Sequence, residues 1–306
     1  MKLLVFGSNG LVGSSLKRIF ENSSIFKDSF FSTRKDTDLF NFDETSKLIS
    51  EYKPDYIINA AAKVGGIHAN NTLRSEFLIE NLKINLNILE SCIPYNTIKI
   101  INLGSSCIYP LDSPNPISES SIMQGTLEPT NSPYAMAKLT AIELGNSLKI
   151  QHGHSITNLM PTNLYGPNDN FSVESSHVIP GMIRRMHDTK ITSGKSFSIW
   201  GSGKPLREFL YVDDLALSIK FIIENNIQES LLNIGSGKEI SIFNLAKIIK
   251  DTLKFHGDLI FDSSKPDGNP RKLLDSSLIN SYGWKPITTL EEGLKKSYNW
   301  FLSKQI

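Results

Sequence analysis

The sequence predicts an α/β protein built on a doubly wound parallel sheet, with a smaller α/β domain for substrate attached to it. Short apolar runs alternate with longer amphipathic segments through the first half of the chain, which is typical of strands joined by crossover helices. The first run leads straight into a glycine-rich turn and then into helical spacing. With 306 residues, 40% of them hydrophobic, the chain can bury a sizeable core.

The elements follow from the chain in order. Residues 2–6 form the first expected strand, and Leu11, Leu16 and Phe20 then recur at the spacing of a helix. Further strands are expected at residues 30–31, 56–62, 98–103, 157–160 and 231–234, and later helices at residues 178–187, 215–224 and 242–255. Residues 108–133 contain five prolines, so we expect a loop that walls a pocket.

The alternation of strands and helices breaks after Asn163, which suggests a domain boundary. We expect residues 1–165, with about 209–236, to form a dinucleotide-binding domain of the Rossmann type. Residues 166–208 and 237–306 would then form the smaller domain.

Composition excludes several classes of function. The chain has 32 basic and 31 acidic residues, a formal charge of +1, so nothing predicts binding to nucleic acid or to an anionic membrane. We find neither a signal-peptide core nor an apolar window of about 20 residues, and we expect a cytoplasmic protein. Cys92 and Cys107 have no metal-ligand spacing, so we expect no metal site.

A glycine-rich turn joins the first strand to the first helix. Its glycines have the spacing GxxGxxG, in the context where backbone N–H groups approach a pyrophosphate at a helix N-terminus. The turn consists of Gly7, Ser8, Asn9, Gly10, Leu11, Val12 and Gly13. It predicts a dinucleotide cofactor.

The end of the second strand indicates which dinucleotide. NAD-preferring proteins carry an acidic residue there for the ribose hydroxyl, whereas this chain has Arg34 and Lys35. Either cation suits a 2′-phosphate, so NADP(H) is favoured, and Asp38 and Leu39 are placed to reach the adenine. A solvated turn after the strand is the alternative interpretation.

Tyr134 and Lys138 are four residues apart on a predicted helix, so their side chains share one face. We expect the ammonium to lower the pKa of the phenol, as a general acid or base near neutral pH requires. Tyr95 and Lys99 have the same spacing by chance. Ser105 favours Tyr134 and Lys138 as the functional pair. It follows a strand at the carboxyl edge, where open α/β sheets bind ligands.

Longer motifs give a resemblance that covers essentially the whole chain. The sequence resembles the extended short-chain dehydrogenase/reductases and, more narrowly, the GDP-L-fucose synthase family. The motifs that carry it are AAAKVGGI (60–67), GSSCIYP (104–110), LEPTN (127–131), PTNLYGP (161–167), DNF (169–171), SHV (176–178) and REFLYVDD (207–214).

The resemblance implies a role for individual residues. Ser105, Tyr134 and Lys138 would carry a reduction, and Cys107 with His177 would form the acid/base pair of an epimerase. Besides the glycine turn, the implied cofactor lining is Leu103, Gly104, Ser105, Ser106, Lys138, Pro161, Thr162, Asn163, Leu164 and His177. The nucleotide sugar would be held by Arg185, Trp200, Arg207 and Asp267. Asn9 departs from the pattern, because some members carry arginine there.

The implied reaction converts GDP-4-keto-6-deoxy-D-mannose to GDP-L-fucose with NADPH, by epimerisation at C3 and C5 and then reduction at C4. The resemblance also implies a homodimer through helices at residues 71–91 and 134–151. Without it, Cys107 would be a small buried hydrophobe and Trp200 a packing residue.

Three other functions fit parts of the sequence. One is a reductase, with or without epimerase activity, for a related GDP-4-keto-deoxysugar such as a heptose or a dideoxyhexose. Sugar 4,6-dehydratases and 4-epimerases are a second, but dehydratases need an Asp and Glu pair where this chain has Cys107 and Ile108. A dinucleotide sensor is the third, although sensors typically lose the tyrosine and lysine.

Overall fold

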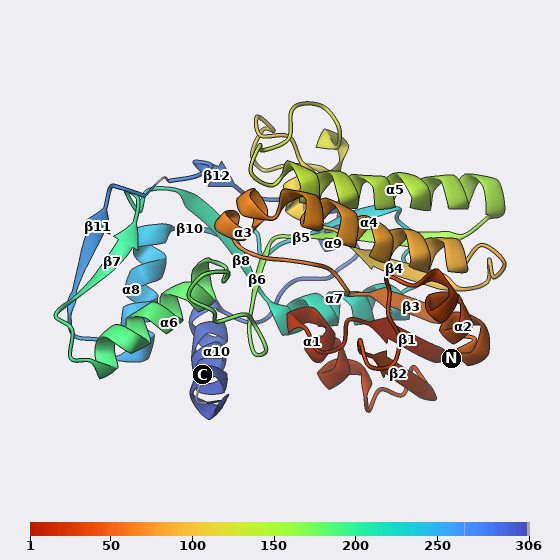
Figure 1. Cartoon of the computed structure of the whole chain (residues 1–306), viewed down its shortest axis with the longest axis horizontal. Coiled ribbons are helices and arrows are strands. Elements are labelled where there is room, and N and C mark those ends of the chain that lie inside the picture. Colours follow the sequence, from red (N-terminus) through yellow and green to blue (C-terminus); the bar gives the residue numbers. More distant parts are fainter. Residues whose placement is uncertain (266, 305–306) are drawn as a thin grey trace.

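The computed structural model describes residues 1–265 and 267–304. Its largest sheet has six parallel strands in the order β2-β1-β3-β4-β5-β9 (Figure 1). The strands are β1 (Lys2–Phe6), β2 (Asp28–Ser32), β3 (Tyr56–Asn59), β4 (Lys99–Leu103), β5 (Ser155–Pro161) and β9 (Leu231–Ile234). From β1 the chain first adds β2 on one side and then adds β3 and the later strands on the other side. The strand order therefore reverses between β1 and β3, which is where such sheets bind ligands.

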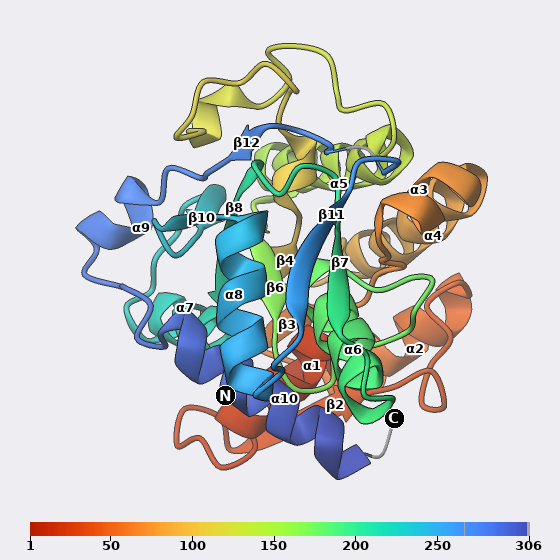
Figure 2. The same ribbon diagram turned by 90° about the vertical axis from the view of Figure 1, so that its left-hand side faces the viewer.

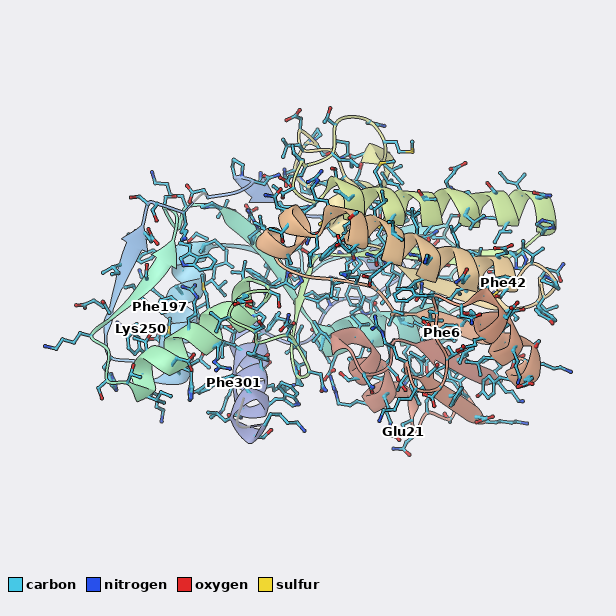
Figure 3. The ribbon with its side chains drawn as sticks, viewed as in Figure 1. Phe6, Glu21, Phe42, Phe197, Lys250 and Phe301 are labelled. Carbon is cyan, nitrogen blue, oxygen red and sulfur yellow. The ribbon has the colours of Figure 1, made fainter. Side chains whose placement is uncertain are left out.

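Both faces of this sheet are covered by helices. Along β1, Leu3 and Val5 pack into one core with α1 (Leu11–Phe20) and α7 (Val212–Glu224). Leu4 and Phe6 pack into a different core with α4 (Arg74–Ser91) and α5 (Ser132–His152). Figure 3 labels Phe6. All four strand residues are fully buried, which explains the continuous apolar run and confirms the predicted doubly wound sheet.

A second region contains smaller sheets and its own core (Figure 2). One sheet joins β10 (Glu239–Ser241), β8 (Leu206–Tyr211), β12 (Arg271–Lys272) and β6 (Asn163–Tyr165), and another joins β11 (Asp258–Asp262) to β7 (Ser196–Trp200). The helices are α6 (Val178–Ile191), α8 (Ile242–Leu253) and α10 (Leu290–Lys304). Phe197 and Phe301 lie in this core (Figure 3).

The chain returns to the first core near its end. Ile279, in α9 (Ser277–Ser281), and Trp284 pack with the residues beneath the large sheet. The predicted domain boundaries assign all of residues 237–306 to the smaller domain, whereas these two residues pack with the first core. The boundaries stay a prediction.

Most predicted elements lie within a few residues of the observed ones, with two corrections. The run 56–62 is a strand only to Asn59, and the backbone at Ala61 lies against Gly7 of the glycine turn. The helix predicted at 71–91 is broken at Leu73 into α3 (Ile67–Thr72) and α4. The remaining helix is α2 (Phe42–Tyr52). Among the described residues, no helix is both long and apolar enough to cross a membrane.

A ladder of buried asparagines crosses the middle of the large sheet. Asn59, Asn102 and Asn158 occupy paired positions on β3, β4 and β5, and each is at most 2% exposed. The Asn59 amide donates to Asn102 at 3.0 Å and to Asn85 of α4 at 3.2 Å. The Asn102 amide donates to Asn158 at 3.3 Å, and Asn158 donates to the Ser230 carbonyl at 3.1 Å.

This asparagine ladder fixes the relative height of three strands. A slip of one residue would leave several amide groups buried without partners, and each such group costs about 1–3 kcal/mol. Asn59 and Asn102 lie at or next to the carboxyl ends of their strands. The ladder therefore fixes the position from which each following loop leaves the sheet.

We predict that Asn102→Leu lowers the free energy of unfolding by about 2–4 kcal/mol, because Asn59 and Asn158 would each lose a buried partner. Urea denaturation measures this loss. Asn96→Ala is the control, because its exposed amide makes one long bond to the His152 carbonyl at 3.4 Å. We expect the control to change stability by less than about 0.5 kcal/mol, and equal effects in both variants would contradict the role of the ladder.

Candidate active site

The glycine turn follows β1 at the point where the chain switches from one side of the sheet to the other. Gly7 has φ +78°, and a side chain there would lie 2.7 Å from the backbone of Ala61. A side chain on Gly13 would lie 2.1 Å from the Gly7 carbonyl oxygen. At Gly10 the nearest protein atom would be 3.6 Å away, which is ordinary contact. Gly7 and Gly13 therefore serve the fold, whereas Gly10 leaves space outside the protein.

That space lies at the start of α1, where unpaired backbone N–H groups favour an anion. Ser8 fastens the turn to the end of β2, because its hydroxyl donates to the Phe31 and Ser32 carbonyls at 3.0 and 2.9 Å. Asn9 is exposed, and Leu11 and Val12 are half-buried. The turn therefore fits the pyrophosphate of a dinucleotide.

The loop after β2 carries the residues predicted to select NADP(H). Arg34 is exposed, and its guanidinium lies 5.5 Å from the centre of the Phe40 ring. Asp38 accepts a hydrogen bond from the Phe40 backbone, and Leu39 is half-buried. Asp36, which our sequence analysis passed over, accepts from both the backbone and the hydroxyl of Thr33. Thr33 holds the pKa of Asp36 low and engages this carboxylate within the loop.

The carboxyl end of β4 brings four of the predicted catalytic residues together. The Ser105 hydroxyl accepts a hydrogen bond from the Cys107 backbone N–H at 3.2 Å, and it lies near enough to the Tyr134 phenol to lower its pKa. Lys138 is 2% exposed, and its ammonium donates to the Leu103 carbonyl at 2.6 Å. The Lys138 nitrogen lies 5.8 Å from the centre of the Tyr134 ring. The helix α5 thus directs its tyrosine and lysine at the end of β4.

The expected lowering of the Tyr134 pKa is wrong for this structure. Burial raises the pKa of the Tyr134 phenol above its ordinary value, and the nearby Cys107 side chain raises it further. Burial also lowers the pKa of Lys138 to about 8, which weakens it as a fixed positive charge. Tyr134 is therefore a neutral hydrogen-bond donor near neutral pH, which is the state that a proton donor in a reduction needs.

The two residues of the predicted epimerase pair come from different parts of the molecule. Cys107 is half-exposed in a short 3₁₀ turn, η1 (Ser106–Ile108), directly after β4. His177 precedes α6 as its N-cap residue, and its side chain keeps access to solvent although nearby protein lowers its pKa by partial desolvation. A backbone hydrogen bond of 3.0 Å from Gly66 to the Ser175 carbonyl ties the loop after β3 to the segment before His177.

The remaining predicted cofactor residues lie beside the end of β4. Pro161 and Thr162 are buried at the end of β5, and Leu164 is half-buried. The Thr162 hydroxyl and the Asn163 amide both donate to the Glu208 carbonyl, at 3.2 and 2.9 Å. Ser106 is buried, and a side chain on Gly104 would lie 2.1 Å from the end of Met160.

The four predicted substrate residues lie in the second region. The Arg185 guanidinium lies 4.4 Å from the centre of the Trp200 ring, and Trp200 is 51% exposed. Asp267 accepts from the Ser202 backbone and hydroxyl at 2.6 and 2.7 Å, which binds it to the turn after Trp200. A side chain on Gly268 would lie 3.5 Å from Arg207, so Arg207 borders the same segment.

Sequence reasoning missed Glu208, a carboxylate with no exposed surface. It accepts backbone hydrogen bonds from Gly237 at 2.7 Å and Leu274 at 3.0 Å, and burial raises its pKa. An acidic residue between Arg207 and the apolar end of the same strand was the available signal. Glu208 directly follows Arg207 in β8, and its hydrogen bonds hold this strand to the segments that contain Gly237 and Leu274. Glu208 therefore fixes the backbone from which the Arg207 side chain extends.

A glycine turn at the switch point of a doubly wound sheet, beside a serine, a tyrosine and a buried lysine, defines an NAD(P)-dependent oxidoreductase of the short-chain type. Residues 3–235 match the family described as the NAD dependent epimerase/dehydratase family. The chain belongs to this family.

Individual relatives indicate which members of the family the chain resembles. The chain is 45% identical to GDP-L-fucose synthase 1 of Arabidopsis thaliana over 98% of its own length and 93% of the relative's. Its fold matches a GDP-L-fucose synthetase from Naegleria fowleri bound to NADP, with a TM-score of 0.89, 32% identity and coverage of 99% and 94%. It also matches a GDP-6-OMe-4-keto-L-xylo-heptose reductase from C. jejuni, with a TM-score of 0.92, 30% identity and coverage of 99% and 98%.

We predict that Gly10→Ala folds with unchanged stability but binds NADPH at least about tenfold more weakly, since the new methyl group occupies only the space left for the pyrophosphate. Fluorescence titration with NADPH measures the affinity. Gly13→Ala provides the contrast, because its methyl group meets the protein itself and should destabilise the fold. Undiminished affinity of a folded Gly10→Ala variant would contradict this assignment.

Proposed function

We propose that the chain is an NADP-dependent epimerase and reductase that converts GDP-4-keto-6-deoxy-D-mannose to GDP-L-fucose. The observation that carries the proposal is the position of Ser105, whose hydroxyl accepts a hydrogen bond from the Cys107 backbone and lies near enough to the Tyr134 phenol to lower its pKa. One ketone oxygen held there would adjoin the proton donor for reduction and the thiol for epimerisation. The identity of 45% to a GDP-L-fucose synthase supports the same substrate.

The residues of the first region fit NADPH. The turn from Gly7 to Gly13 would hold the pyrophosphate, and Arg34 would pair with the 2′-phosphate. Asp38 and Leu39 would border the adenine, and the residues at the ends of β4 and β5 would border the nicotinamide. When bound, NADPH supplies the hydride that reduces C4.

Epimerisation requires proton transfer at both neighbours of the ketone. The C4 ketone acidifies the hydrogens on C3 and C5, so one acid/base pair can invert either centre. Cys107 as thiolate would remove a proton, and His177 would return one to the opposite face. Ser105 and Tyr134 would stabilise the enolate by hydrogen bonds to its oxygen.

Reduction uses the same oxygen. Tyr134, kept neutral by burial, would donate its proton to the developing alkoxide, and Ser105 would keep that oxygen in place. Lys138, fixed on the Leu103 carbonyl, would position the phenol and favour its transient negative charge. In the second region, Arg185 and Arg207 would bind the diphosphate and Trp200 would stack on a ring of the substrate.

A C4 reductase for a related GDP-4-keto-deoxysugar is the second candidate. The fold match to a heptose reductase favours it, with a TM-score of 0.92. The presence of Cys107, a half-buried cysteine beside Ser105, favours the epimerase and reductase instead, because a reduction alone does not need a thiol.

We also propose a homodimer in the cytoplasm. The helices α4 and α5 pack against each other and expose Ile79, Leu86, Met136 and Ile150. Apolar groups on two adjacent helices suit a bundle with the same helices of a second copy. A free catalytic thiol suits a reducing compartment.

Tyr134→Phe is expected to reduce NADPH turnover by about a thousandfold or more, because it removes the proton donor, while NADPH affinity changes little. Stopped-flow absorbance and fluorescence titration measure the two effects. Turnover within about threefold of wild type would eliminate Tyr134 as the acid.

Cys107→Ala is expected to stop deuterium uptake at C3 and C5 when the keto-sugar is held in D2O without NADPH. The variant should still oxidise GDP-L-fucose at C4 with NADP+, since that step needs no proton transfer at carbon. Mass spectrometry and NADPH absorbance follow the two reactions. If uptake persisted at the wild-type rate, the base would be another group.

Ile79→Lys is expected to shift the protein from dimer to monomer, because it puts a charge in the proposed helix bundle. Sedimentation velocity measures the mass, and Ile287→Lys is the control, because Ile287 is 76% exposed and lies outside α4 and α5. A dimer that survives Ile79→Lys would rule out this interface.

A further inference from the structure

A buried hydrogen-bond network lies directly behind the turn that carries Cys107. The Tyr109 phenol, 2% exposed, donates to the side-chain oxygen of Asn233 at 2.6 Å. The Asn233 amide donates to the Ile117 carbonyl at 2.9 Å and to the Asp275 carbonyl at 3.0 Å. Its backbone N–H donates to the Glu119 carboxylate at 2.9 Å.

Asn233 itself cannot move easily. It has no exposed surface, and it lies in β9, paired with Met160 of β5. Both amide hydrogens and the side-chain oxygen have partners within the protein. An asparagine engaged in this way is a rigid anchor, because any displacement leaves buried groups without hydrogen bonds.

The anchor holds one end of a very short turn. Cys107 lies in η1, which spans three residues, and Tyr109 follows directly as its C-cap. The other end is capped by the Ser105 hydroxyl. Ile108, between Cys107 and Tyr109, is fully buried. The backbone on both sides of Cys107 is therefore fixed, by a catalytic serine before it and by the Tyr109 phenol after it.

We propose that Tyr109 is a positioning residue for the thiol of Cys107, acting through its hydrogen bond to Asn233. The inference rests on the proposed function, because it requires Cys107 to transfer protons at C3 and C5. A base must be held at the correct distance from carbon, and a displacement of about 1 Å can reduce a rate by about a hundredfold. The reduction at C4 depends on Ser105, Tyr134 and Lys138, none of which bonds to Tyr109.

Tyr109→Phe tests the proposal, because it removes the hydroxyl and keeps the ring that packs against Met160 and Leu139. We expect deuterium uptake at C3 and C5, in D2O without NADPH, to slow by about ten- to a hundredfold. The KM for the keto-sugar should stay within about twofold. Oxidation of GDP-L-fucose with NADP+, measured on the same preparation, should stay within about threefold and shows that the variant is folded.

Tyr165→Phe is the matched control, because Tyr165 is also buried and its hydroxyl also bonds to a carbonyl, that of Leu290 at 3.4 Å. Its deuterium uptake should remain close to wild type. Wild-type uptake by Tyr109→Phe, or a parallel loss of uptake and of C4 oxidation, would overturn the positioning role.

The wild type and Cys107→Ala, assayed alongside, separate this inference from the proposed function. If the wild type takes up no deuterium, or Cys107→Ala takes it up normally, the epimerase function fails and the role of Tyr109 fails with it. If both behave as proposed and Tyr109→Phe behaves as wild type, only the positioning role is overturned.

Discussion

The active site depends on the register of β3, β4 and β5. The ladder of Asn59, Asn102 and Asn158 fixes that register, because each amide finds its partner only when the strands are level. From that level edge come the backbone of Ala61, against which the phosphate turn closes, and the Leu103 carbonyl, which holds Lys138. The asparagine ladder thus prevents a shift in strand register, and the loops that bear the site residues keep their relative positions.

Burial then determines the protonation state of the site. The enclosure that raises the pKa of Tyr134 would keep its proton available for the alkoxide in the proposed reduction, and the same enclosure lowers the pKa of Lys138 to about 8. Ser105 needs no change of charge, and it contacts both the tyrosine and the backbone of Cys107. In the proposed mechanism a single serine would thus serve both reactions, and the rest of the site would keep that serine and its neighbours in position.

The sequence alone predicted the fold and much of the site because period and spacing are local signals. The run from Lys2 to Phe6, the glycine turn and the pair Tyr134 and Lys138 could all be read directly. The pKa of Tyr134 could not, because burial depends on packing between segments distant in sequence. Nor could the Tyr109 and Asn233 bond, which joins residues 124 positions apart. The predicted roles of the cofactor and substrate residues stay predictions until variants are measured.

The identity of the product tests the central claim most directly. The protein would be incubated with GDP-4-keto-6-deoxy-D-mannose and NADPH, and the sugar product identified by NMR. We predict GDP-L-fucose, inverted at C3 and C5 and reduced at C4. A product reduced at C4 without inversion would contradict the epimerase function of Cys107 and His177, and absence of turnover would contradict the substrate itself.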